Sequence, residues 1–183
     1  MLCGFPGAHR LAAAQATTRI LVLGDSLSAE YGLRRDTGWV KLLGDRLAAS
    51  TGSPSARQYS LVNASISGET TSGGRTRLPA LLAQHRPSVV ILQLGANDGL
   101  RGLPIATMRE NLRAMIVASR AAGARVLLVG IRLPPNYGRD YEERFFATYA
   151  ELAKAEKVAL APFLLDGFAD RTEWFQADRI HPN

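Results

Sequence analysis

Cysteine is nearly absent from this chain of 183 residues, since Cys3 is the only one. An intramolecular disulfide framework is therefore excluded, and no Cys and His cluster has the spacing of a structural zinc site. Long apolar runs are also missing. Runs such as residues 89–92 and 126–130 are far shorter than the roughly 20 residues that cross a bilayer. We therefore expect no stable membrane insertion.

Lysine is scarce: the 22 basic residues are 19 Arg and 3 Lys, against 16 acidic residues and a formal net charge of +6. No basic run is longer than Arg34-Arg35, whereas nucleic-acid-binding modules usually concentrate their charge in a stripe or a tail. We interpret the scattered arginines as a solvated surface and expect no nucleic-acid partner. Weak attraction to anionic substrates, such as phospholipid head groups or acyl-CoA, is the alternative interpretation.

Residues 1–16 contain no acid and end in Ala14-Gln15-Ala16, which fits the small-x-small pattern of a signal-peptidase site. The apolar stretch at 11–14 is short, and no basic segment precedes it. Two interpretations stay open: the remnant of an export signal, or an unstructured N-terminal extension. The first interpretation predicts a periplasmic or secreted protein.

Apolar strands and helical stretches alternate from Thr18 onward. Short apolar runs predict strands, and apolar residues at helical spacing predict helices. The predicted strands are 19–24, 59–63, 88–94, 125–131 and 158–160, and the predicted helices are 38–49, 76–85, 104–122 and 140–156. This order predicts an α/β fold, a flavodoxin-like three-layer sandwich with a central parallel sheet of about five strands and helices on both faces. We assign it to one domain, 17–183.

Polar residues follow the first three predicted strands, at the edge where such sheets bind ligands. Ser26 is either a nucleophile at a helix N-terminus or, like Asp25, a helix cap. Gly68 either presents its N–H from a tight turn or is an ordinary loop glycine. Asn97 either offers an amide donor or belongs to an Asn-Asp-Gly turn. None of these segments, taken alone, decides between the catalytic and the structural interpretation of its residue.

A serine nucleophile needs a base, and the chain has only three histidines. His9 lies in the leader, and His85 lies in a last helical turn, where a surface cation suits the helix dipole. Asp178 precedes His181 by three residues, so its carboxylate can reach the imidazole. The pair is either a base with its orienting carboxylate or a surface pair. A metal site would need further ligands that are missing, so we expect no metal.

Together these residues resemble a known family. Gly24-Asp25-Ser26-Leu27, Gly68, Gly95-x-Asn97-Asp98 and Asp178-x-x-His181 are similar in order and spacing to the four blocks of the SGNH hydrolases, or GDSL esterases/lipases. The stretches 62–68, 77–82, 97–102, 131–138 and 180–183 resemble one bacterial periplasmic subgroup, the multifunctional acyl-CoA thioesterases, arylesterases and lysophospholipases.

The resemblance implies a serine hydrolase that cleaves acyl or aryl esters and thioesters through an acyl-enzyme, without a cofactor. It implies that Ser26 is the nucleophile, His181 the base and Asp178 its orienting partner. It also implies an oxyanion hole made by the N–H groups of Ser26 and Gly68 and the side-chain amide of Asn97. We expect a monomer that acts on small-molecule substrates, lysophospholipids among them.

Apolar residues of the same edge either line a groove for an acyl or aryl group or pack on one another. They are Leu100, Leu103, Leu133, Pro134 and Tyr137. Gly73-Gly74 predicts a hinge that lets a lid segment move.

Two features depart from the family pattern. Glu30 stands where members often have a small residue, and the sequence stops at Asn183, where members continue into another helix. We therefore expect the domain to lack its last helix. Alternative functions are a carbohydrate acetylesterase on the same fold and a non-catalytic, flavodoxin-like binding module.

Overall fold

Five parallel strands form one sheet in a computed structural model that describes residues 17–50 and 58–183. The predicted export-signal remnant, 1–16, lies outside the described residues. The strand order is β2-β1-β3-β4-β5, and every neighbouring pair is parallel. The strands are β1 (Thr18–Gly24), β2 (Tyr59–Asn63), β3 (Val89–Gln93), β4 (Arg125–Val129) and β5 (Ala159–Ala161).

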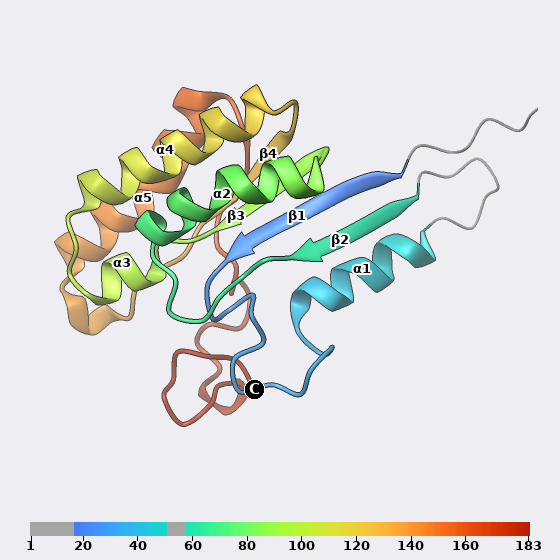
Figure 1. The fold of residues 1–183 in the computed structure, drawn as a ribbon. Coiled ribbons are helices and arrows are strands. Elements are labelled where there is room, and N and C mark those ends of the chain that lie inside the picture. Colours follow the sequence, from blue (N-terminus) through green and yellow to red (C-terminus); the bar gives the residue numbers. More distant parts are fainter. Residues whose placement is uncertain (1–16, 51–57) are drawn as a thin grey trace, which may run out of the picture.

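Helices cover both faces of the sheet, so the predicted three-layer α/β fold is confirmed (Figure 1). Helix α1 (Trp39–Ala49) lies on one face, and α2 (Thr71–His85), α4 (Ile105–Ala121) and α5 (Arg139–Glu156) lie on the other. The chain moves outward once, from β1 to β2, and then returns past β1 toward β3, β4 and β5. Because crossovers between parallel strands are right-handed, this reversal of direction places the first helix opposite the other three.

The central strand β1 is buried on both sides, which explains its continuous apolar sequence. Leu21 and Leu23 pack in the larger core cluster, beneath α2, α4 and α5. Ile20 and Val22 face the smaller cluster, which contains Val40 of α1. Packing on both faces of the sheet therefore fixes the position of the residues that follow β1.

Helix α2 begins at Thr71, five residues before the predicted start. The Thr70 hydroxyl caps it by accepting a hydrogen bond of 3.3 Å from the Gly73 N–H. The predicted hinge at Gly73-Gly74 is therefore wrong, because both glycines lie inside the helix. Gly74 is buried, and a Cβ there would meet the side chain of Leu94. This glycine lets α2 approach the sheet closely.

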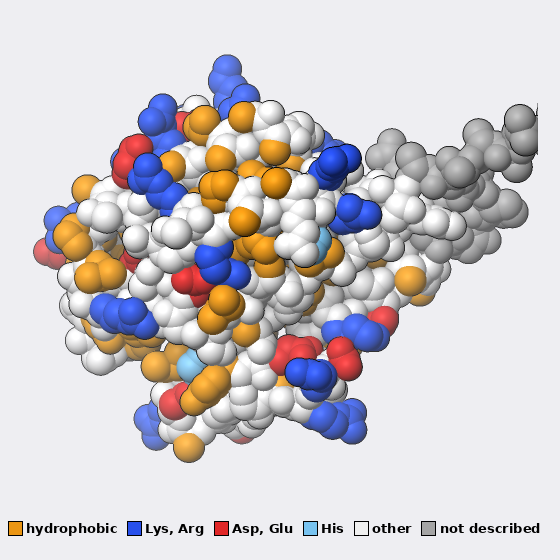
Figure 2. Space-filling model, viewed as in Figure 1, with side chains coloured by type: hydrophobic (Ala, Val, Ile, Leu, Met, Phe, Trp, Pro, Cys, Tyr) orange, Lys and Arg blue, Asp and Glu red, His pale blue; other side chains and the backbone are white. Residues whose placement is uncertain are grey.

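Three short elements were not predicted. They are α3 (Ala96–Leu100), η1 (Pro135–Tyr137) and η2 (Thr172–Trp174). The Asn97-Asp98-Gly99 sequence, which is typical of a turn, forms part of α3. Among the described residues no helix is long and apolar enough to cross a membrane. On the face drawn in Figure 2, Lys and Arg side chains lie in separate groups between apolar and neutral ones, rather than in a single stripe.

Two glycine-to-alanine substitutions in helices should have opposite effects on stability. Gly74→Ala forces repacking around the buried Leu94, and we expect it to lower the free energy of unfolding by roughly 1–3 kcal/mol. Gly44→Ala in α1 places its methyl in ordinary van der Waals contact, 3.9 Å from the Leu61 side chain, and should raise the free energy of unfolding by up to about 1 kcal/mol. Urea denaturation of both variants measures this, and equal effects would contradict the close approach of α2.

Candidate active site

The carboxyl ends of β1, β2 and β3 lie side by side, because β1 pairs with both of the other strands. The loop after β2 stays bound to β1: the Ile66 N–H donates to the Gly24 carbonyl at 3.1 Å. This edge, between β1 and β3, is also where the direction of strand addition reverses. Parallel sheets bind ligands at such a point.

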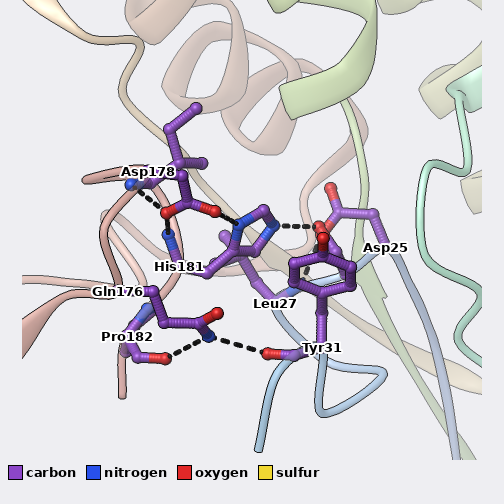
Figure 3. A network of polar contacts seen from close by, with 9 residues as sticks. Asp25, Leu27, Tyr31, Gln176, Asp178, His181 and Pro182 are labelled. Atoms are coloured by element: carbon purple, nitrogen blue, oxygen red, sulfur yellow. Dashed lines mark hydrogen bonds and ion pairs between the residues drawn. The ribbon is translucent and has the colours of Figure 1, made fainter.

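Ser26, His181 and Asp178 form one hydrogen-bonded chain at this edge. Figure 3 shows the contact between Asp178 and His181. Ser26 Oγ lies 2.8 Å from His181 Nε2, and His181 Nδ1 lies 2.6 Å from Asp178 Oδ2. The structure thus brings together the three side chains that the sequence analysis selected. A hydroxyl, an imidazole and a carboxylate in this order have the geometry of a nucleophile, a base and its orienting group.

The second oxygen of Asp178 holds the backbone of the same turn. Asp178 Oδ1 accepts hydrogen bonds from the N–H groups of Ile180 at 2.9 Å and His181 at 3.0 Å. Partial burial would raise the pKa of Asp178, but these bonds and the contact with the His181 side chain lower it from 3.8 to about 2. The carboxylate therefore stays charged beside the imidazole.

Gln176 connects the His181 segment to the loop after β1. Its Nε2 donates to the carbonyls of Tyr31 and Pro182, both at 2.9 Å, and its backbone N–H donates to the His181 carbonyl at 2.8 Å. The Tyr31 ring also lies against the His181 ring, with 4.5 Å between the ring centroids. These contacts set the position of the imidazole relative to Ser26.

Gly68 and Asn97 lie together at the ends of β2 and β3. Asn97 Nδ2 donates to the Glu69 carbonyl at 3.0 Å, and Gly68 has a φ of +80°, which favours glycine. Within residues 17–50 and 58–183, the N–H groups of Ser26 and Gly68 donate no hydrogen bond. Both groups, and the second amide proton of Asn97, are therefore free to bind an oxyanion.

A buried polar cluster beneath these loops joins them to each other. The Asp98 carboxylate accepts hydrogen bonds from the Thr71 N–H at 2.8 Å and the Thr71 hydroxyl at 2.5 Å. Asn111 Nδ2 donates to the same hydroxyl at 3.1 Å. Since Asp98 follows Asn97 and Thr71 lies three residues after Gly68, the cluster fixes the spacing between the two loops.

A second buried cluster lies beneath Ser26. Gln93, the last residue of β3, donates from Nε2 to Asp25 Oδ1 at 3.0 Å and accepts from the Ser28 hydroxyl at 2.5 Å. The Ser28 oxygen accepts from the indole N–H of Trp39 at 3.2 Å. The cluster therefore links β3, the serine loop and the start of α1.

Asp25 is fully buried, and its Oδ2 has no hydrogen-bond partner among the described residues. Burial raises the pKa of Asp25 from 3.8 to about 6, although hydrogen bonds from the Leu27 N–H and Gln93 and the proximity of His181 act in the opposite direction. The Asp25 carboxyl, next to Ser26 in the chain, thus binds a proton at mildly acidic pH.

Two cavities lie beside the loop that carries Ser26, and Leu27 lines both. The larger, of about 370 Å³, is mainly apolar and contains three of the five predicted groove residues, Leu100, Leu133 and Pro134. The prediction is wrong for Tyr137, whose hydroxyl donates to the Leu100 carbonyl at 3.0 Å and whose ring packs on the core. It is also wrong for Leu103, which is exposed and does not line the cavity. The smaller cavity, of about 240 Å³, is lined by Ser26 and His181 themselves.

Glu30 shapes the loop after Ser26 rather than the substrate path. Its carboxylate accepts hydrogen bonds from the N–H groups of Gly38 at 2.7 Å and Asp36 at 3.0 Å, and these bonds lower its pKa. The departure from the small residue expected here thus closes the segment 30–38 on itself. In the described part of the chain, no group of three His, Cys, Asp or Glu side chains has the arrangement of a metal site.

Sequence reasoning missed Gln93, Gln176 and Tyr31. Gln93 gave a signal, because a polar side chain at the end of a doubly buried strand must have buried partners. Gln176 and Tyr31 gave none, because their roles depend on contacts between segments that lie 145 residues apart.

The comparisons with known proteins agree with this geometry. The model of the GDSL-like lipase/acylhydrolase family matches residues 22–183. Esterase TesA of Pseudomonas aeruginosa is 51% identical, over 91% of this chain and 81% of the relative. An arylesterase of Vibrio mimicus is 44% identical, over 93% of this chain and 83% of the relative. Thioesterase 1/protease 1/lysophospholipase L1 of Escherichia coli is 46% identical, over 93% of this chain and 78% of the relative.

Solved structures agree as well. The psychrotrophic esterase EstA from Pseudoalteromonas sp., in a structure inhibited by monoethylphosphonate, superposes with a TM-score of 0.84 at 43% identity. The match covers 91% of this chain and 88% of that one. On the family model and on these relatives, the chain belongs to the GDSL-like lipase/acylhydrolase family.

Proposed function

We propose that this serine hydrolase cleaves carboxylic esters and thioesters through an acyl-enzyme on Ser26. The observation that carries the proposal is the continuous chain of hydrogen bonds from Ser26 Oγ through His181 to Asp178. The relatives named esterase, arylesterase and thioesterase support the substrate class.

In the acylation step, Ser26 Oγ attacks the carbonyl carbon while its proton passes to His181 Nε2. The same nitrogen then protonates the leaving oxygen or sulfur as its bond to the carbonyl carbon breaks. Asp178 keeps the imidazole in the required tautomer and stabilises the imidazolium. Water, deprotonated by His181, afterwards attacks the acyl-enzyme, which releases the acid and restores Ser26.

The negative charge of the tetrahedral intermediate falls on the former carbonyl oxygen. The N–H groups of Ser26 and Gly68 and the Asn97 amide are its donors in this proposal. Loss of one such donor typically lowers turnover by roughly 100- to 1,000-fold. Since the Asp98–Thr71 contacts fix both loops, the donors are in place before the substrate binds.

The larger cavity is the site for the acyl chain. Its walls are mainly apolar, and it adjoins Leu27 and Ala96, the neighbours of Ser26 and Asn97. Such a cavity favours an acyl chain over the acetyl group of a carbohydrate acetylesterase. Lysophospholipids fit the same requirement, because they combine a long acyl chain with a polar alcohol.

We also propose that the catalytic domain spans 17–183 and acts as a monomer in the periplasm or outside the cell. The signal-peptidase pattern that ends at Ala16 and the family resemblance support this location.

Ser26→Ala removes the nucleophile, and we expect kcat for p-nitrophenyl butyrate to fall by roughly 10⁵- to 10⁶-fold. A fluorophosphonate probe should label the parent protein but not the variant. Ser88→Ala, at the opposite end of the sheet and exposed, is the control and should keep full activity. A Ser26→Ala variant with parental activity would exclude the proposed mechanism.

Asp178→Asn should lower kcat by roughly 1,000- to 10,000-fold, because an amide favours the wrong imidazole tautomer.

The pKa of Asp178 also predicts a pH effect on stability. Since it falls from 3.8 to about 2 on folding, the carboxylate stabilises the fold above pH 3.8, and this contribution disappears as the pH falls toward 2. Urea denaturation from pH 2 to 5 should show a smaller pH slope for Asp178→Asn than for the parent. Equal slopes would contradict the assigned hydrogen bonds.

Ala169→Phe tests the acyl cavity, because Ala169 lines it and is exposed. The new ring should fill part of the cavity and lower kcat/KM for p-nitrophenyl octanoate by roughly 10- to 100-fold, at about 0.8 kcal/mol for each methylene that loses its contact. Hydrolysis of p-nitrophenyl acetate should change little. Ala155→Phe, on the exposed side of α5, is the matched control. A uniform loss on both esters would place the acyl chain elsewhere.

A further inference from the structure

The smaller cavity of about 240 Å³ lies on the His181 side of the nucleophile. Ser26 and His181 both line it, whereas neither is among the described residues that line the larger cavity. The two cavities meet at Leu27 and Leu165, which line both. A substrate that reacts at Ser26 can therefore extend into both, with its ester group between them.

Proton transfer decides which half of the substrate enters the smaller cavity. The leaving atom must lie within hydrogen-bond reach of the general acid when its bond to the carbonyl carbon breaks. His181 Nε2 is that acid in the proposed mechanism, and its ring forms a wall of the smaller cavity. The leaving group therefore enters this cavity, and the acyl chain takes the other.

We propose that the smaller cavity is a leaving-group site that favours aromatic alcohols, with Tyr31 as its specificity-determining residue; this inference rests on the proposed function of Ser26 and His181. In the acylation step, the Ser26 Oγ–carbon bond forms and the carbon–oxygen bond to the leaving group breaks. The proton moves from His181 Nε2 to that oxygen, and the neutral alcohol departs from the cavity.

Three aromatic side chains, Tyr31, Trp39 and Phe168, line the smaller cavity together with four leucines. Tyr31 is 50% exposed and lines the cavity, and its ring lies against the His181 ring. Trp39 donates its indole N–H to Ser28, so its orientation is fixed, and Phe168 lies on the same cavity. A planar ring gains both burial and ring–ring contact in such a site.

The side-chain donors of Thr37 and Asn183, which line the cavity, do not suit a sugar. The Thr37 hydroxyl donates to the Arg34 carbonyl at 2.6 Å, and Asn183 Nδ2 donates to the carbonyls of Glu173 and Phe175. These donors are therefore already bound to the protein. A carbohydrate leaving group would lose its water without gaining replacement hydrogen bonds from them, whereas an aromatic ring needs none.

The test uses acetyl esters whose alcohols have similar acidity but different shapes: methyl, cyclohexylmethyl and benzyl acetate. The parent protein should show the highest kcat/KM for benzyl acetate. In Tyr31→Ala, the benzyl-to-methyl ratio of kcat/KM should fall by roughly 3- to 10-fold, because a ring–ring contact is lost. Tyr31→Phe should keep the parental ratio. Tyr59→Ala, a half-exposed tyrosine at the opposite end of the sheet, is the matched control.

A second series keeps methanol as the leaving group and varies the acyl chain from acetate to octanoate. Tyr31→Ala should leave this preference unchanged. The inference fails if Tyr31→Ala lowers methyl and benzyl acetate hydrolysis equally, or if it changes the acyl-chain preference. Activity of Ser26→Ala would instead overturn the proposed function, so the two failures are distinguishable.

Discussion

Parallel pairing of β1 with both β2 and β3 places the ends of three strands side by side at one edge of the sheet. Ser26, Gly68 and Asn97 lie in the segments that follow these ends, so the sheet brings the three segments to one edge. The register of the strands is fixed by burial, because a slip of one residue would move Leu21 and Leu23 out of the larger core. Hydrophobic packing therefore sets the position of Ser26, Gly68 and Asn97 along the strand direction.

Buried hydrogen bonds convert this coarse alignment into a specific geometry. The Asp98–Thr71 contacts tie the Gly68 loop to the Asn97 loop, and Gln93 ties the Ser26 loop to β3. Buried polar groups are stabilising only when they are paired, and most of these are. Asp25 Oδ2, on the residue before Ser26, is an exception, and within the described residues the hydroxyl oxygens of Ser60 and Ser65 are also buried without a partner. An uncompensated group at Asp25 fits the general tendency of functional sites to be built at some loss of stability.

The sequence predicted the strands well, because doubly buried strands have continuous apolar runs that do not depend on context. It predicted the early part of α2 and all of α3 poorly, since Gly73-Gly74 and Asn97-Asp98-Gly99 favour turns locally and are helical only through tertiary contacts. The residues Ser26, His181 and Asp178 were accessible to sequence reasoning because few histidines exist and their spacing follows a known family. The smaller cavity was not, because Tyr31 and Phe168, which both line it, come from segments far apart in the sequence. The prediction for Tyr137 failed for a related reason: its hydroxyl donates a hydrogen bond to the Leu100 carbonyl, and no local sequence pattern indicates this contact.

The hydrogen bond between Ser26 and His181 joins residues 155 positions apart in the chain. No local fragment can form it, because β1 must first lie in the completed sheet and the segment 176–182 must dock on the Tyr31 loop. The proposed nucleophilicity of Ser26 therefore depends on long-range contacts, which are slower to find than local ones. A covalent serine-directed probe therefore counts native molecules in a mixture, and the chemistry of one hydroxyl reports the folding state of the whole domain.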